Sequence, residues 1–102
     1  MLIYHIVLPE HWKARDPDAP YEAESLATEG FIHCSYLSQL EEVLKRYYSG
    51  IRNVLILGIE TEKLVAHLVE EPSTNSEIYP HIYGPINRDA IVGAKVRILI
   101  DA

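Results

Sequence analysis

Short strand-like segments dominate this sequence, and only one stretch has the apolar spacing of a long helix. Apolar side chains recur every three or four positions over residues 37–48, which predicts a helix with one apolar face. β-Branched and other apolar residues gather in short runs at 2–8, 54–59 and 94–100, which predicts strands. Few helices separate these strands, so little chain remains for the crossovers of a parallel sheet. The pattern predicts an α+β fold with mainly antiparallel strands and one main helix.

Two segments near the predicted helix carry further expectations. Ser35 or Ser38 precedes the helix, and either is expected to cap its first turn. Residues 21–28 are acidic and fit no single period, so they are left as an irregular segment or a mobile flap over a pocket.

Two of the predicted strands have features that bear on their place in a sheet. Pro80 interrupts the strand expected at 78–83, and proline cannot donate to a strand ladder, so a sheet edge or a bulge is expected there. In the last strand, alternation predicts that Val96, Ile98 and Ile100 face inward while Lys95 and Arg97 face outward.

Length and charge restrict the classes of partner. The 102 residues predict a single domain spanning residues 1–102, and a net charge of −6 argues against duplex nucleic acid as a partner. A single small anionic ligand held by a local cluster stays compatible with that charge. Cys34 is the one cysteine, and no stretch is long and apolar enough to span a membrane, so we expect a soluble cytoplasmic protein. The sequence leaves the oligomeric state open.

The first chemical signal is the segment EGFIHCS at residues 29–35. Alternate residues of a strand share a face, so Phe31, His33 and Ser35 are expected to point one way and Cys34 the other. His33 and Cys34 therefore form a poor nucleophilic pair. His33 is a candidate ligand contact, with a half-buried histidine as the alternative.

The second signal is YPHIYGP at residues 79–85. Tyr79, His81 and Tyr83 are expected to share one strand face, where aromatic rings and hydroxyls suit a flat ligand. The alternative is an aromatic strand packed on the core, which is favoured for Tyr79. A histidine between two tyrosines favours a functional interpretation of His81.

Histidines and carboxylates elsewhere allow other chemistry. His5, His33, His67 and His81 all fall on predicted strands, but no two have tight metal-ligand spacing, so we expect no metal. Two acidic positions, Glu71 and Glu77, are candidates for a carboxylate that stabilises positive charge at a sugar carbon.

Four segments, IYHIV, GFIHCS, EPS and YPHIYGPI, resemble in order and spacing a bacterial family known as domain of unknown function 952. The likeness covers residues 2 to about 100. The fold of that family is similar to that of ADP-ribosyltransferases, which implies two small antiparallel sheets packed across each other around an NAD-shaped cleft. By position, His5 resembles the first-strand residue of that superfamily and His33 its second-strand residue.

The resemblance implies an enzyme, or a former enzyme, that binds NAD or a related nucleotide. It implies that His5 hydrogen-bonds ribose hydroxyls, and that Ser35 and Tyr83 help hold the ligand. It also implies catalytic roles for His33, His81 and Glu71, with His81 as donor or general acid. Two alternatives remain, a non-catalytic module that binds a metabolite or a protein tail, and a histidine-ligated metal hydrolase. The sequence names neither the acceptor nor the true ligand.

Overall fold

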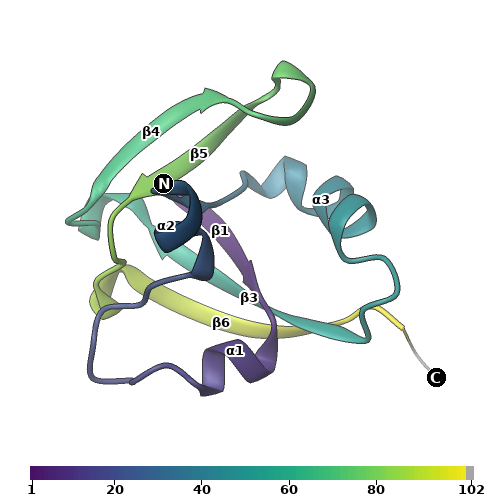
Figure 1. Ribbon diagram of the computed structural model, residues 1–102, viewed down its shortest axis with the longest axis horizontal. Coiled ribbons are helices and arrows are strands. Elements are labelled where there is room, and N and C mark those ends of the chain that lie inside the picture. Colours follow the sequence, from purple (N-terminus) through teal and green to yellow (C-terminus); the bar gives the residue numbers. More distant parts are fainter. Residues whose placement is uncertain (101–102) are drawn as a thin grey trace.

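The computed structural model of the protein describes residues 1–100, so the last two residues of the predicted domain lie outside the described part. Within it, strands form two three-stranded sheets that lie across each other (Figure 1). The α+β architecture with antiparallel strands and one main helix is confirmed. The strands are β1 (Leu2–Val7), β2 (Ile32–His33), β3 (Asn53–Glu60), β4 (His67–Pro72), β5 (Ile78–Tyr83) and β6 (Ile91–Ile98), and the helices are α1 (Pro9–Lys13), α2 (Glu24–Glu29) and α3 (Leu40–Tyr47).

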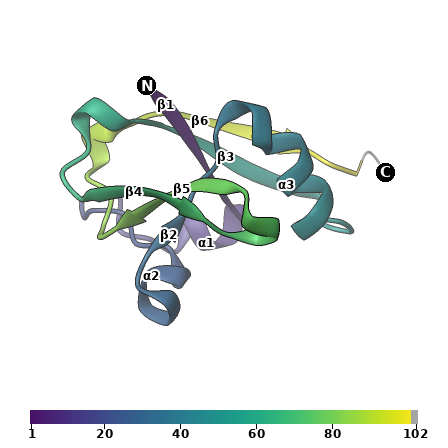
Figure 2. The same cartoon turned by 90° about the horizontal axis from the view of Figure 1, so that it is seen from above.

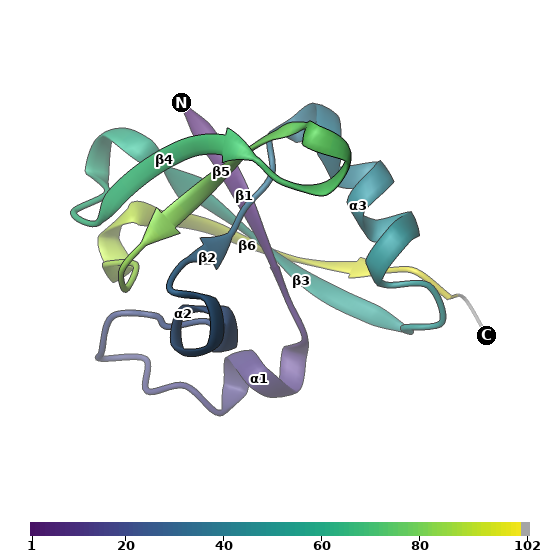
Figure 3. The same cartoon turned by 45° about the horizontal axis from the view of Figure 1, so that its top comes forward.

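The first sheet has the order β1-β3-β6, with β3 at its centre. Both faces of β3 are apolar, and this is the property that predicted a central strand: Leu57 faces the second sheet, whereas Val54 packs against α3. Figure 3 shows the hairpin β4–β5 on one side of this sheet, with its turn close to α3. The sheet therefore has one face toward each partner layer.

The second sheet has the order β2-β5-β4, so Pro80 lies on its middle strand. The prediction of an edge or a bulge was wrong, because β4 pairs with β5 through Pro80 without a register shift. The carbonyl of Pro80 accepts a hydrogen bond from the backbone N–H of Cys34, just beyond β2, over 3.1 Å. Since the N and C=O of one strand residue point to the same side, the missing N–H faces the place where β2 has already ended. Proline is tolerated at this position because the β2–β5 ladder, which ends at His33 and His81, does not require an N–H from residue 80.

The main helix was predicted to begin at residue 37 after a serine cap, but α3 begins at Leu40. Residues 37–39 form a 3₁₀ turn that leads into α3, and the side-chain carbonyl of Gln39 accepts from the backbone N–H of Tyr36 at 3.0 Å. Neither Ser35 nor Ser38 caps the helix. Instead, the backbone of Ser35 exchanges two hydrogen bonds with Tyr4 of β1, which ties the two sheets together.

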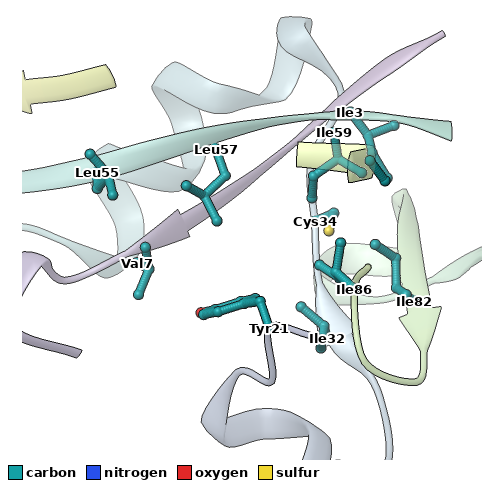
Figure 4. Packing of buried hydrophobic residues seen from close by; sticks show 11 residues of the cluster. Ile3, Val7, Tyr21, Ile32, Cys34, Leu55, Leu57, Ile59, Ile82 and Ile86 are labelled. Carbon is teal, nitrogen blue, oxygen red and sulfur yellow. The ribbon is translucent and has the colours of Figure 1, made fainter. Parts of the chain in front are cut away.

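Two apolar clusters hold the layers together. The larger lies between the sheets and includes Tyr21, which is 1% exposed, and the Cys34 side chain (Figure 4). Residues 21–28 are not irregular: Tyr21 pairs with Ile86 through its backbone and anchors the start of α2. The smaller cluster joins α3 to the outer face of the first sheet through Leu40 and Leu44. Burial raises the pKa of the Cys34 thiol, so this side chain acts as a small core residue.

The edge strand β6 differs from its prediction. Val96 and Ile98 are 64% and 63% exposed, because no element within residues 1–100 covers the sheet face beside them. Arg97 lies on the opposite face and pairs with Glu41 of α3 at 2.6 Å. Residues 1–100 contain no helix with the length and apolarity needed to cross a bilayer.

Candidate functional site

Two adjoining cavities of about 290 and 400 Å³ run along the junction of β1, β2, α3 and the β4–β5 turn. They share four lining residues, namely His33, Ser35, Val43 and Tyr48, and we refer to both together as the groove. Figure 2 shows α3 and the turn between β4 and β5 near each other at one end of the molecule. The combined space is in the range that proteins use for small-molecule ligands.

One end of the groove is rich in tyrosine rings and hydroxyl groups. Tyr47 and Tyr48 come from the end of α3, and Tyr79 comes from β5. The Tyr47 hydroxyl lies 2.6 Å from Oγ1 of Thr74, so α3 and the turn between β4 and β5 touch across this end. Sequence reasoning did not select the two helix tyrosines, because Tyr47 reads as part of the apolar stripe.

His33 stands where the two cavities meet. Gly30 has φ of +89°, a conformation that glycine adopts without strain, and it ends α2 so that the chain can turn into β2. That turn brings the Glu29 carboxylate to 3.1 Å from Nε2 of His33. The imidazole is half exposed and is held by a carboxylate, so it is oriented and accessible to a ligand.

A second histidine lies beside His33, on the same face of the second sheet. His81 pairs directly with His33 across the β2–β5 ladder, and the two rings are 5.3 Å apart, edge to face. Phe31 stacks on the His81 ring with centroids 4.2 Å apart. The predicted face-sharing of Phe31 with His33 is confirmed, although sequence reasoning gave Phe31 no role.

His81 is buried and has one strong partner. Its Nδ1 lies 2.7 Å from Oε1 of Glu71, whereas its Nε2 is buried and has no hydrogen-bond partner among residues 1–100. The Tyr83 hydroxyl also donates to the Glu71 carboxylate. The Tyr83 and His81 hydrogen bonds hold the pKa of Glu71 below its usual range, so this carboxylate stays ionised. The ionised carboxylate orients the His81 ring with Nδ1–H toward it, so Nε2 points away from Glu71.

His5 is buried and lines the first cavity of the groove, but both of its ring nitrogens are bonded within the protein. Its Nδ1–H donates to the backbone carbonyl of His33 at 2.7 Å, so its Nε2 accepts from the Tyr21 hydroxyl at 2.9 Å. Burial lowers the pKa of His5 to about 4, which keeps the imidazole neutral. Both ring nitrogens are used inside the protein, and a ribose hydroxyl would have to displace Tyr21 to reach Nε2.

The structure thus divides the predicted site residues into three groups. His33, His81, Glu71 and Tyr83 form one connected cluster on a single sheet face. Ser35 is buried and lines the groove beside His33. His5 lines the first cavity and holds the backbone of His33 through its Nδ1–H.

A metal site needs several ligand side chains that converge on one point. Among residues 1–100, no group of three His, Cys, Asp or Glu side chains is placed to hold a metal ion. Glu77, the other candidate carboxylate, accepts from the side-chain amide of Gln39 at 2.8 Å and so belongs to the start of α3.

Comparison with known proteins gives a family and a fold. Residues 6–94 match the profile of a family described as protein of unknown function, DUF952. The crystal structure of protein CC0527 from Caulobacter crescentus is similar, with a TM-score of 0.82 and 28% identity, covering 94% of this chain and 85% of that one. Its solution NMR structure gives a TM-score of 0.77 at 28% identity, covering 92% and 82%. No curated protein matches the sequence.

Proposed function

The chain belongs to the DUF952 family, whose description assigns no function, and from the geometry of the groove we propose that it binds NAD or a related nucleotide. One observation carries the proposal. His33 lines both cavities of the groove, and its ring also contacts His81, whose buried Nε2 has no partner. A buried nitrogen without a hydrogen bond is costly, and functional sites are where such cost is retained.

The walls of the groove suit the parts of a nucleotide. Tyr48 and Tyr79 provide ring surface against which a base or a nicotinamide can pack. Ser35, Ser73 and Thr74 offer hydroxyl groups for ribose oxygens. His33 lies between these two kinds of wall, so it is the residue expected to contact the ligand at its sugar.

The paired histidine supplies acid–base chemistry. In the proposed reaction the bond between ribose C1′ and the nicotinamide nitrogen breaks, and nicotinamide leaves with the bonding electrons. A nucleophile, either water or an acceptor hydroxyl, forms the new bond to C1′ and gives its proton to Nε2 of His81. The bound ligand must first open this atom to the groove, because His81 is buried and lines neither cavity. Glu71 holds the imidazole in the required orientation and balances its positive charge. This assignment rests on the kinship with ADP-ribosyltransferases that the sequence motifs suggest, and two antiparallel sheets beside a groove are consistent with it.

The experiment measures binding and turnover on the same samples. NAD, ADP-ribose and nicotinamide are titrated into the full chain by calorimetry, and nicotinamide release from NAD is followed by chromatography. His33→Ala is expected to weaken binding about tenfold or more with little change in Tm, because it removes the hydrogen bond proposed to the ligand's sugar. His67→Ala is the matched control, since His67 is an exposed histidine on β4 outside the groove. Equal losses in both variants, or no binding of any of these nucleotides at millimolar concentration, would contradict the proposal.

A second candidate is a non-catalytic module that holds a similar ligand in the same groove. The internal use of both His5 nitrogens favours it, because the first-strand histidine then has no free atom for a substrate. Binding of a nucleotide without release of nicotinamide over a prolonged incubation would select this candidate.

A further inference from the structure

Arg15 lines the groove with a cationic side chain that has no part in the proposed function. It lies just after α1 and lines the cavity that also contains His33 and Ser35. Its backbone is fixed, because its N–H donates to the carbonyl of Trp12 at 3.1 Å. The side chain therefore starts from a rigid position at the end of the groove away from Tyr79.

The guanidinium of Arg15 lacks the partners that three other arginines have. Its Nε is buried without a hydrogen bond, and no carboxylate forms an ion pair with Arg15 among residues 1–100. By contrast, Arg46 pairs with Glu42 at 3.1 Å and Arg97 pairs with Glu41. Arg88 donates to two backbone carbonyls, each at 2.7 Å. An unpaired, partly buried guanidinium is unusual because its desolvation is not offset.

Most polar side chains that line the cavity beside Arg15 can donate a hydrogen bond, and one is a carboxylate. His11 lines the same cavity. Burial raises the pKa of the Tyr21 hydroxyl, and the positive charge of Arg15 partly offsets that rise. Among residues 1–100, Glu24 is the one carboxylate that lines this cavity, and it is exposed and forms no ion pair with Arg15. Because the whole chain carries a net charge of −6, an anionic ligand needs a local cation of this kind.

We propose that Arg15 binds a phosphate group, and that the natural ligand of the groove is a nucleoside phosphate rather than a nucleoside or a free base. The choice of a nucleotide rests on the proposed function. Guanidinium forks match phosphate oxygens in geometry and charge, and Nε supplies one arm of such a fork. A ligand with its sugar at His33 and its ring near Tyr79 places its phosphate toward the Arg15 end.

The test compares ligands that differ only in phosphate. Adenosine and AMP, and nicotinamide riboside and nicotinamide mononucleotide, are titrated into the wild-type chain, Arg15→Gln and Arg52→Gln. Arg52 is exposed and lines neither cavity of the groove, so its variant makes the same change in net charge. We expect Arg15→Gln to reduce the affinity for each nucleotide about tenfold while leaving each nucleoside unchanged. Arg52→Gln is expected to leave all four within about twofold, the range of a screened surface charge.

A second readout separates this inference from the proposed function. In ¹H–¹⁵N spectra the Nε–H of Arg15 has its own resonance, which pyrophosphate is expected to shift in the wild-type chain. If nucleotides and nucleosides both fail to bind but pyrophosphate shifts that resonance, the anion site stands and the nucleotide function is lost. If pyrophosphate leaves the resonance unmoved, or Arg15→Gln weakens nucleoside and nucleotide equally, the phosphate site is overturned.

Discussion

Nδ1 of His81 lies 2.7 Å from Oε1 of Glu71, across the β4–β5 ladder and under the ring of Phe31. The histidine is 2% exposed, whereas the carboxylate is partly open to solvent. Glu71 is thus the connection between a buried imidazole and the surface, and Tyr83 holds it from the outer side. The same arrangement serves stability and, in the proposed function, acid–base chemistry.

Removing Glu71 tests the structural half of that relationship. Glu71→Ala leaves both ring nitrogens of His81 without a protein partner, so we expect the free energy of unfolding to fall by about 1–3 kcal/mol. Urea denaturation measures the change. Glu62→Ala is the control, because its carboxylate is 84% exposed and the expected effect is within about 0.5 kcal/mol. A loss for Glu71→Ala as small as the control would mean that water replaces the carboxylate.

The pH dependence of stability reports on His5. Its pKa is lowered from 6.5 to about 4 by burial, so between these values the unfolded chain binds a proton that the folded chain does not. Stability contributed by the neutral imidazole is therefore full above pH 6.5 and is lost as the pH falls toward 4. The expected slope is up to about 1.4 kcal/mol per pH unit in that window.

Comparison of His5→Gln with the wild type isolates this slope. Glutamine can donate and accept one hydrogen bond but does not titrate, so the variant is expected to lose the pH dependence between 6.5 and 5. Urea unfolding at half-unit pH steps measures it. An exposed histidine provides the control, and His67→Gln should keep the wild-type slope. An unchanged slope in His5→Gln would show that another group causes the effect.

Local pattern was sufficient to predict the strands and the face that carries the site. Alternation placed Phe31 with His33, and His81 with Tyr83, because side-chain direction in a strand depends only on the local backbone. The contact between His33 and His81 depends on the pairing of β2 with β5, which residues nearly fifty positions apart determine. The resemblance to a known family implied roles for both histidines, but composition and periodicity did not determine which strands pair.

Tertiary context decided the features that were predicted wrongly. Val96 and Ile98 alternate like core residues, but a face becomes core only when another element covers it. In the described part of the chain, no element covers that side of β6. Pro80 has a middle-strand position because β2 is only two residues long. Tyr21 is a core residue within an acidic segment. Its buried hydroxyl bonds to His5 of β1, a partner that the local sequence around Tyr21 does not indicate.

The apolar stripe of α3 gives a matched pair of positions. Leu44 is 5% exposed and packs on the first sheet, so Leu44→Ala is expected to lower the free energy of unfolding by about 2–5 kcal/mol. Leu37 belongs to the same predicted stripe but is 67% exposed, and Leu37→Ala should change it by less than about 0.5 kcal/mol. Thermal or urea unfolding of both variants measures the contrast. Comparable losses at the two positions would contradict the orientation of the helix.

The turn between β4 and β5 stores backbone strain at the mouth of the groove. Ser76 has φ of +62°, a left-handed conformation in which a Cβ crowds the carbonyl oxygen, at a cost of about 1–2 kcal/mol. Glycine removes that cost but loses more entropy on folding, so we expect Ser76→Gly to raise the free energy of unfolding by about 0.5–1 kcal/mol. Ser73 is the matched control in the same turn, because its φ is −135° and glycine brings only the entropic loss. Ser73→Gly is therefore expected to destabilise the protein by about 0.5–1 kcal/mol, and urea unfolding of the two variants measures both signs. Destabilisation by Ser76→Gly equal to that by Ser73→Gly would show that the left-handed conformation carries no strain.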